Sequence, residues 1–361
     1  MTLKKKRNSD NNDGVEGDGT EQAFADLDLS DNPNEGQRVG AATVLRVARM
    51  LWHRRPDLSR STTEEDKEFR ASYGCGLLVA TNTWNLLITK ALLPNGGTVE
   101  HFLWMLTFMK TYAKGKNLSK ACGNADLKTI RHWVWQFIRA VAELESIVVG
   151  VGSRRRSNET RLAKSRENDL TTLYCYFFQI IWENRFKGDA GNDCLVSVDG
   201  TDFRVKQLGP TFSSHKFAKK SGVRYEVALC IKTGDIVWLN GPFPCGQLND
   251  ISIFRQALMT ELSANERVEA DDGYVGESPQ HIKCPASFTA NPITKFMQER
   301  VRSRQETINN RFKFWCILAH PYRHDLGDHG DVFRAVAVVC QLTINQGERL
   351  FDCGYKDPPY N

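Results

Sequence analysis

The most constraining feature of this sequence is a short apolar run, Cys194-Leu195-Val196-Ser197-Val198, that leads directly into Asp199. Runs of this length favour a buried β-strand when turn residues bound them. Before this point the chain shows helical patterns, and after it the chain shows strand patterns. We therefore expect a sheet to begin here, with Asp199 at the end of its first strand.

The segments that follow predict the rest of a mixed α/β domain. A partner strand is expected at 203–207 after a turn at Gly200-Thr201, and strands at 223–231 and 235–239 are joined by the hairpin turn Lys232-Thr233-Gly234. We next expect a helix whose apolar stripe lies within 253–262. It is followed by strands at 266–270 and 286–289 and by long helices at 293–318 and 332–349. Three antiparallel strands, a helix, a strand and further helices is the element order of an RNase H-like domain, which we place at 169–350.

The rest of the chain divides by composition. Residues 1–37 are rich in Asp, Asn, Gly and Glu and predict a disordered tail. The basic cluster Lys4-Lys5-Lys6-Arg7 in this tail is either a nuclear import signal or a solvated terminus. Residues 38–152 predict a helical domain, 153–168 a basic linker, and 351–361 a C-terminal tail.

One part of the helical domain has the spacing of a helix-turn-helix. A short helix near 118–122 is followed by the turn Gly123-Asn124-Ala125 and by a long helix that begins at Asp126. The long helix has an apolar stripe on one side and basic side chains on the other. DNA binding by Lys128, Arg131 and Arg139 is one interpretation, and an ordinary helical bundle with a solvated face is the other.

Charge and cysteine usage narrow the function classes. The net charge is +5, but residues 1–36 hold four basic and nine acidic side chains, so the other 325 residues hold 44 basic and 34 acidic ones. A basic folded part favours a polyanionic partner, and Arg154, Arg155 and Arg156 in the linker are candidate phosphate contacts.

Ten cysteines without a C-x-x-C pair indicate a reducing compartment. No apolar run is long enough for a membrane span, and we expect neither a membrane protein nor a secreted one.

Three carboxylates are predicted to converge. Asp199 and Asp271 each end a strand, and the two strands lie side by side in a sheet of this order. On the helix that follows, Glu306 shares a face with Arg302, with Asn309 or Asn310, and with Lys313. Clustered carboxylates are stable mainly when a divalent metal neutralises them, and hard oxygen ligands suit Mg²⁺ or Mn²⁺. Two such ions support in-line attack on a phosphodiester. Taken singly, each acid is equally compatible with a turn, a helix cap or a solvated position.

Four segments, in order, resemble the PIF/Harbinger group of DDE transposases and transposase-derived nucleases. They are 196–203 (VSVDGTDF), 246–254 (GQLNDISIF), 270–274 (ADDGY) and Arg302-x-x-x-Glu306. The resemblance covers about residues 95–350. It implies a metal-dependent DNA endonuclease or transposase with Asp199, Asp271 and Glu306 as the catalytic, metal-holding triad.

The resemblance also adds residues and partners. Asp250 matches a fourth acid of the family, although the His and Ser that usually flank that acid are absent here. Asp272 is a reserve candidate beside Asp271, and Arg302 and Lys313 are candidate contacts to DNA phosphates or partners of the acids. The implied partner is DNA, in the nucleus. A Myb-like DNA-binding partner protein, a homo-oligomer, and a non-cleaving DNA-binding or adaptor protein on the same fold stay open.

Two further sets of residues are ambiguous. Lys206, Lys216, Lys219, Lys220 and Arg224 lie on or beside the first strands, where they either follow a DNA backbone or are solvated. The cluster His320, His324, Asp325, Asp328, His329 and Asp331 suggests zinc, but it lacks Cys partners and the spacing of a closed four-ligand site. We therefore interpret the second set as a polar surface loop.

Overall fold

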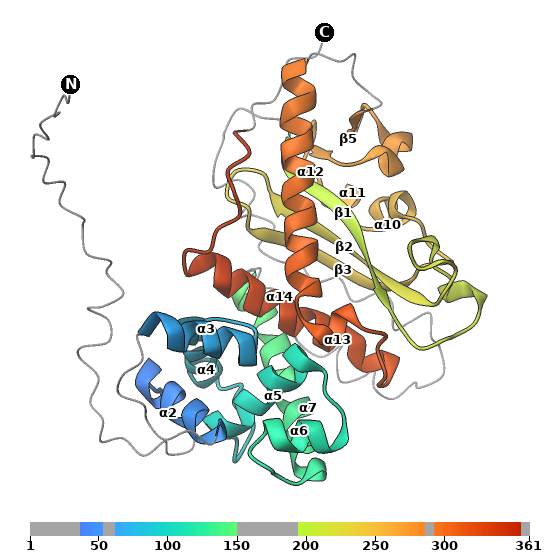
Figure 1. Ribbon diagram of the computed structural model, residues 1–361. Helices are drawn as coiled ribbons and strands as arrows, with labels where there is room; N and C mark the ends of the chain where they lie inside the picture. The colour runs from blue at the N-terminus through green and yellow to red at the C-terminus, as the bar shows by residue number, and fades with distance from the viewer. Residues whose placement is uncertain (1–36, 53–61, 150–193, 286–291, 355–361) are drawn as a thin grey trace, which may run out of the picture.

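The computed structural model describes residues 37–52, 62–149, 194–285 and 292–354. The predicted tail before residue 37, the basic linker with Arg154, Arg155 and Arg156, and residues 169–193 of the predicted RNase H-like domain lie outside the described residues. Within them the protein is a mixed α/β structure, as the sequence patterns predict (Figure 1).

The sheet has five strands in the order β3-β2-β1-β4-β5. β1 (Cys194–Arg204), β2 (Gly222–Cys230) and β3 (Ile236–Pro244) pair antiparallel. The two short strands β4 (Arg267–Glu269) and β5 (Ile282–Lys283) run parallel to β1 on its other side. β1 is therefore the central strand, and residues that follow β4 come to lie beside it. The hairpin turn predicted at Lys232-Thr233-Gly234 is confirmed, with Gly234 at φ 78°.

The turn predicted at Gly200-Thr201 is wrong. β1 continues through both residues, because its ladder with β2 is unbroken from Val196 opposite Cys230 to Arg204 opposite Gly222. Asp199 therefore lies inside this strand and not at its end, and Phe203 and Arg204 belong to β1 and not to a separate partner strand. Gly200 has another role: a Cβ built on it would lie 1.9 Å from Oδ1 of Asp250. The glycine thus lets an acid of the next helix approach the strand closely.

Helices cover both faces of the sheet. α12 (Pro292–Lys313) crosses one face, and α13 (Cys316–Ala319) and α14 (His329–Asn345) follow it (Figure 1). The other face packs its apolar side chains against α10 (Asp250–Gln256), α11 (Leu258–Glu261) and the 3-10 turn η5 (Asp272–Glu277). The single helix predicted at 293–318 is thus two helices, and the strand expected at 286–289 lies outside the described residues.

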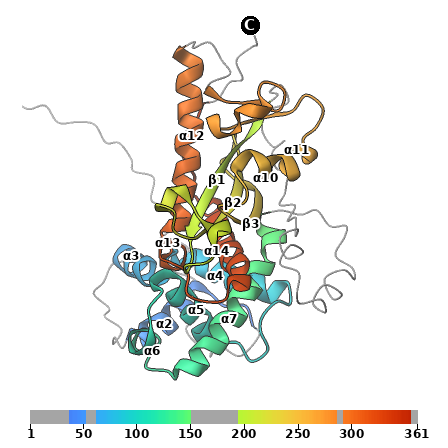
Figure 2. The same cartoon turned by 90° about the vertical axis from the view of Figure 1, so that its right-hand side faces the viewer.

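The first helices form a layer beyond the sheet. They are α2 (Ala41–Leu51), α3 (Thr62–Tyr73), α4 (Leu77–Thr89), α5 (Val99–Thr111), α6 (Gly115–Ala121), α7 (Leu127–Glu143) and α8 (Glu145–Val148). α14 lies between this layer and the sheet in two perpendicular views (Figure 1, Figure 2). One hydrophobic cluster runs from these helices through α14 to the sheet. The apolar stripe predicted for the long helix is confirmed, since Ile130, Val134, Phe137, Ile138 and Val141 of α7 are buried.

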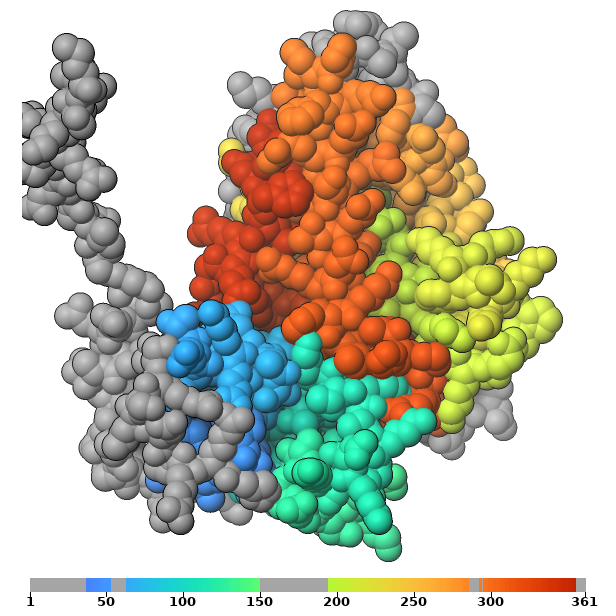
Figure 3. Space-filling model, in the orientation of Figure 1, coloured from blue at the N-terminus to red at the C-terminus, as the bar shows by residue number. Residues whose placement is uncertain are grey.

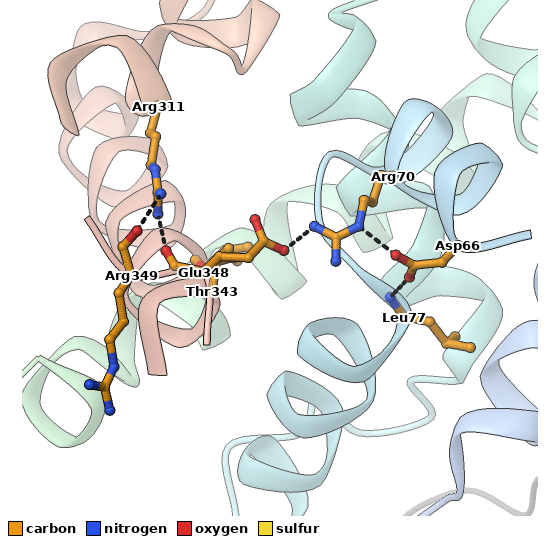
Figure 4. Close-up of polar contacts among 8 residues, drawn as sticks. Asp66, Arg70, Leu77, Arg311, Thr343, Glu348 and Arg349 are labelled. Carbon is orange, nitrogen blue, oxygen red and sulfur yellow. Dashed lines mark hydrogen bonds and ion pairs between the residues drawn. The ribbon is translucent and has the colours of Figure 1, made fainter. Parts of the chain in front are cut away.

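A polar contact also joins the first helices to the end of the chain. In the space-filling view the blue surface of α3 lies against the red surface of the C-terminal segment (Figure 3). Arg70 of α3 binds Asp66 at 2.5 Å and forms an ion pair with Glu348, while Asp66 accepts from the backbone N–H of Leu77 at 3.0 Å (Figure 4). Arg311 donates to the carbonyl of Glu348 at 2.8 Å. Because Arg70 and Glu348 are 39% and 43% exposed, their ion pair contributes at most about 1 kcal/mol.

Candidate active site

Asp199 lies on β1 under α12, and two amide side chains set the position of that helix on the sheet. Nδ2 of Asn309 donates to Oδ2 of Asp199 at 2.7 Å. One turn earlier, Gln305 accepts from the hydroxyl of Ser197 at 3.0 Å and donates to the carbonyl of Val227 at 2.9 Å. The buried face of α12 therefore carries amides that match polar groups of β1 and β2, and one of them orients the Asp199 carboxylate.

Asp271 follows the end of β4, which pairs with β1 up to Ser197, and so comes to lie near Asp199. It caps η5, and its Oδ1 accepts from the backbone N–H of Gly273 at 2.9 Å. The pKa of Asp199 is raised to about 6, chiefly by burial, with Lys216 opposing the shift and the charges of Asp271 and Asp250 adding to it. Nζ of Lys216 donates to the carbonyl of Gly200 at 2.8 Å, one residue from Asp199. The three aspartates thus lie within electrostatic range of one another, with a lysine close by.

Asp250 lies against Gly200 in the first turn of α10. The helix cap is Asn249, whose side chain accepts from the backbone N–H of Ser252, so Asp250 is not needed as the cap. Burial raises the pKa of Asp250, and Arg224 and Lys216 oppose this shift. Nη1 of Arg224 lies 3.2 Å from Oδ1 of Asp250.

A buried ion network surrounds this position, and sequence patterns did not predict it. Arg224 on β2 lies opposite Asp202 on β1 and binds both of its carboxylate oxygens, at 2.7 and 3.1 Å. Ser214 donates to the same carboxylate at 2.7 Å. Asp202 and Arg224 are 2% and 9% exposed, so the suggestion that Arg224 follows a DNA backbone is wrong. The only hint in the sequence is that Arg224 alternates with Val223 and Tyr225, a pattern that a strand with a solvated face shows equally well.

Tyr274 completes the surroundings of the acids. Its ring is buried against Phe254, and its hydroxyl has no hydrogen-bond partner in the described part of the chain. Burial raises its pKa, as do the nearby charges of Glu226, Asp250, Asp199 and Asp271. Glu226 accepts from the indole N–H of Trp238 at 2.9 Å, and burial raises its pKa to about 8. This edge of the sheet therefore holds more carboxylate groups than its cations neutralise.

The surroundings of Glu306 differ from those of the three aspartates, because Glu306 is more exposed to solvent. It is exposed on α12, one turn before Asn309, and it forms no hydrogen bond or ion pair with another described residue. Arg302 is exposed one turn earlier. Lys313, two turns later, lies within electrostatic range of Asp199 and Asp202, and its Nζ is 6.0 Å from the ring centroid of Phe203. The three polar positions follow one side of α12, as the spacing predicts.

The carboxylates do not form a ready metal cage. Among residues 37–52, 62–149, 194–285 and 292–354, no three His, Cys, Asp or Glu side chains are gathered closely enough to hold a metal ion. The donor chemistry nevertheless fits a hard divalent cation, because Asp199 is half-buried beside two other acids and its charged form is disfavoured without a cation. Asp199 and Asp271 are the two side chains best placed to share such an ion.

The predicted DNA contacts outside the sheet have different environments. Lys128 and Arg131 are exposed on α7, beyond a turn in which Gly123 and Asn124 have φ 71° and 63°. Arg139 forms an ion pair with Asp328 at 3.1 Å, which joins α7 to the segment before α14. Lys128 and Arg131 are therefore the more available cations of this helix.

The interpretation of the His- and Asp-rich segment as a solvated loop is wrong for two of its histidines. His329 is fully buried and hydrogen-bonds through Nδ1 with the hydroxyl of Tyr225 at 2.8 Å. His324 packs among aromatic rings: its ring centroid lies 5.1 Å from that of Trp135 and 5.5 Å from that of Phe108. The sequence did not reveal this because α14 begins at His329 and carries its first turn into the core.

The titration of Asp199 gives a pH-dependent prediction. A folded pKa of about 6 against an ordinary value of 3.8 means that ionisation of Asp199 costs about 3 kcal/mol of stability above pH 6 in metal-free protein. The cost disappears as the pH falls below 3.8, where both states are protonated. We expect Asp199→Asn to be more stable than wild type at pH 7 in EDTA, with a difference that shrinks toward pH 4. Urea unfolding of both proteins at several pH values measures it, and a pH-independent difference would contradict it.

Comparison of the chain with models of known protein families, with curated proteins and with solved structures found no match. Among the described residues, no helix combines the length and the apolar character that crossing a membrane requires. The geometry of the chain's own residues therefore carries the functional proposal.

Proposed function

We propose that this protein is a divalent-metal-dependent DNA endonuclease or transposase with an RNase H-like catalytic domain. The observation that carries the proposal is the meeting of Asp199 from β1 and Asp271 from the end of β4 beside Asp250. The strand order, with three antiparallel strands followed by two parallel ones, supports the RNase H-like assignment. The resemblance of four ordered segments to PIF/Harbinger transposases supports the reaction class.

In this proposal Asp199, Asp271 and Glu306 hold Mg²⁺ or Mn²⁺, and Asp250 assists. When bound, the ions activate water or a 3′-hydroxyl and stabilise the leaving oxygen. Asn309 helps to fix the direction of the Asp199 carboxylate, since it donates to Oδ2. Lys216 and Lys313, near Asp199, are placed to bind the phosphates that flank the reacting bond.

Glu306 offers a specific test because α12 carries a matched carboxylate. Glu299 is exposed on the same helix and has no partner among the described residues, but it lies two turns before Glu306. We expect Glu306→Gln to lower the rate of supercoiled-plasmid nicking in Mg²⁺ or Mn²⁺ by more than about tenfold, and Glu299→Gln to leave it unchanged. Equal nicking by both variants would remove Glu306 from the site.

A second candidate function is a DNA-binding or adaptor protein that no longer cleaves. The ion pair between Asp250 and Arg224 favours this second function, because an arginine of the protein already neutralises the carboxylate of Asp250. The same samples separate the two functions. Metal-dependent nicking that Glu306→Gln lowers supports the nuclease, whereas DNA binding in a gel-shift assay without nicking at any metal concentration supports the adaptor.

A further inference from the structure

A cavity of about 260 Å³ lies away from the acids, between the helices α5, α6 and α7 and the segment at Arg323 and His324. The three helices lie together in both cartoon views (Figure 1, Figure 2). Residues that line the cavity include Phe108, Leu118, Arg131, Trp135, Arg323 and His324. Its volume is near the lower end of the range for ligand sites, roughly 300–1,000 Å³, which suits a group the size of one nucleotide.

Aromatic side chains form one wall of this cavity. The rings of Phe108 and Trp135 are 6.1 Å apart, and His324 meets both of them edge-on. Trp135 is only partly buried, although it packs against the core. A partly exposed ring that is fixed in this way, here Trp135 backed by the buried Phe108, stacks well on a nucleobase.

Cations line the same cavity. The guanidinium of Arg323 lies 3.8 Å from the ring centroid of Tyr112 and donates to the carbonyl of that residue, so the charge is held in place. Arg131 is exposed and makes no hydrogen bond or ion pair with another described residue. Lys114 also borders the cavity. Fixed and free cations beside an aromatic wall suit a ligand that has a planar ring and a phosphate.

His324 supplies an unpartnered polar atom. Its Nε2 is buried and has no hydrogen-bond partner in the described part of the chain. Burial lowers the pKa of His324, and the positive charges of Arg323, Lys206 and Arg131 lower it further. The negative charge of Asp328 opposes this shift. The imidazole is therefore neutral at pH 7, and one more hydrogen-bonding group would satisfy it.

The cavity is connected to the acidic site through β1. The carbonyl of Arg204 accepts from the backbone N–H of Tyr322 at 2.8 Å, so the segment bearing Arg323 and His324 lies beside the end of that strand. Asp199 is five residues earlier, about 17 Å along an extended strand. A DNA strand held at Asp199 is thus within a few nucleotides of the cavity.

We propose that this cavity binds one nucleotide unit, with its base against Trp135 and its phosphate against Arg131 and Arg323. Where the nucleotide belongs to a DNA strand, the inference rests on the proposed nuclease function. Only an unpaired or extruded nucleotide exposes the face of its base, so the preferred ligand is single-stranded DNA.

The test uses the full chain in EDTA, where no metal-dependent step contributes. Fluorescence anisotropy measures the binding of a labelled ten-nucleotide oligodeoxyadenylate, with dAMP, inorganic phosphate and the matched duplex as competitors. Arg131→Ala is compared with Lys120→Ala, which removes one exposed positive charge from α6 without touching the cavity. We expect Arg131→Ala to weaken oligonucleotide binding about tenfold and Lys120→Ala to change it little. Trp135→Leu is expected to weaken it similarly, with folding checked by circular dichroism.

The competitors distinguish the source of the nucleotide. Binding of the oligonucleotide in preference to dAMP, lost in Arg131→Ala, supports a nucleotide within a DNA strand. Equal binding of dAMP, lost in the same variant, supports a free nucleotide. The proposal is overturned if Arg131→Ala behaves like Lys120→Ala, or if phosphate competes as well as dAMP. Because no metal is present, loss of nicking by Glu306→Gln and failure of the cavity to bind are separate results.

Discussion

Replacing Asp199 by Asn is expected to abolish metal-dependent DNA nicking, lowering its rate by more than about 100-fold. Loss of a residue that only supports a metal ligand costs up to about 100-fold, and loss of a proposed direct ligand is expected to cost more. The substitution keeps an oxygen that accepts the hydrogen bond from Asn309 but removes the negative charge with which, in the proposed site, Asp199 would bind a cation together with Asp271. We expect Mn²⁺ binding, measured by calorimetry, to be lost together with nicking of supercoiled plasmid.

Unfolding does not explain such a loss, because the same variant is expected to be more stable than wild type in EDTA at pH 7. Glu299→Gln serves as the control, since it neutralises an exposed carboxylate of α12 that lies two turns before Glu306. Wild-type nicking by Asp199→Asn would show that the buried acid is not part of a catalytic site. Loss of metal binding without any nicking by wild type would leave the adaptor hypothesis in place.

Replacing Arg224 by Ala is expected to destabilise the fold by about 3–5 kcal/mol, the cost of leaving buried charges without their partner. Arg224 contacts two carboxylates, those of Asp202 and Asp250. The ion network holds the pKa of Asp202 below its ordinary value, so its stabilisation is present at neutral pH and is lost as the pH falls through that lowered pKa. Urea denaturation at pH 7 and at acid pH measures both effects.

An exposed ion pair provides the comparison for Arg224. Arg255 pairs with Glu277, and its side chain is 47% exposed. We expect Arg255→Ala to cost less than about 1 kcal/mol. A similar small cost for Arg224→Ala would mean that water or rearranged side chains compensate the two acids, and that the network is not what holds Asp250 beside Gly200.

Local patterns predicted most of the elements and the closeness of Asp199 to Asp271, although Asp199 lies within β1 and not at its end. The hairpin at Gly234, the strand before Asp271 and the buried stripe of α7 all depend on nearest neighbours in the chain, and they are confirmed. The prediction at Gly200 failed because a Gly-Thr pair favours a turn only when no neighbouring strand holds it extended. Here the ladder with β2 does so.

The site was predicted less completely than the fold. Nothing close in the sequence relates Asp202 to Arg224, 22 residues apart, or Asn309 to Asp199, 110 residues apart. Such pairs form only when strand register and helix packing bring the side chains together. The catalytic roles of Asp199, Asp271, Glu306 and Asp250 remain predictions for the experiments above.

The sequence by itself determined where strands and helices form, because periodicity, turn residues and apolar runs act over a few residues. It also determined that Asp271 follows a strand and which polar residues share one side of α12. Only the tertiary structure decided that Asp250 lies against a glycine and pairs with Arg224, that His329 is buried, and that Arg131 and Trp135 share a cavity with His324. The reason is that burial and charge pairing depend on contacts between distant segments, and these exist only once the sheet and its covering helices have packed.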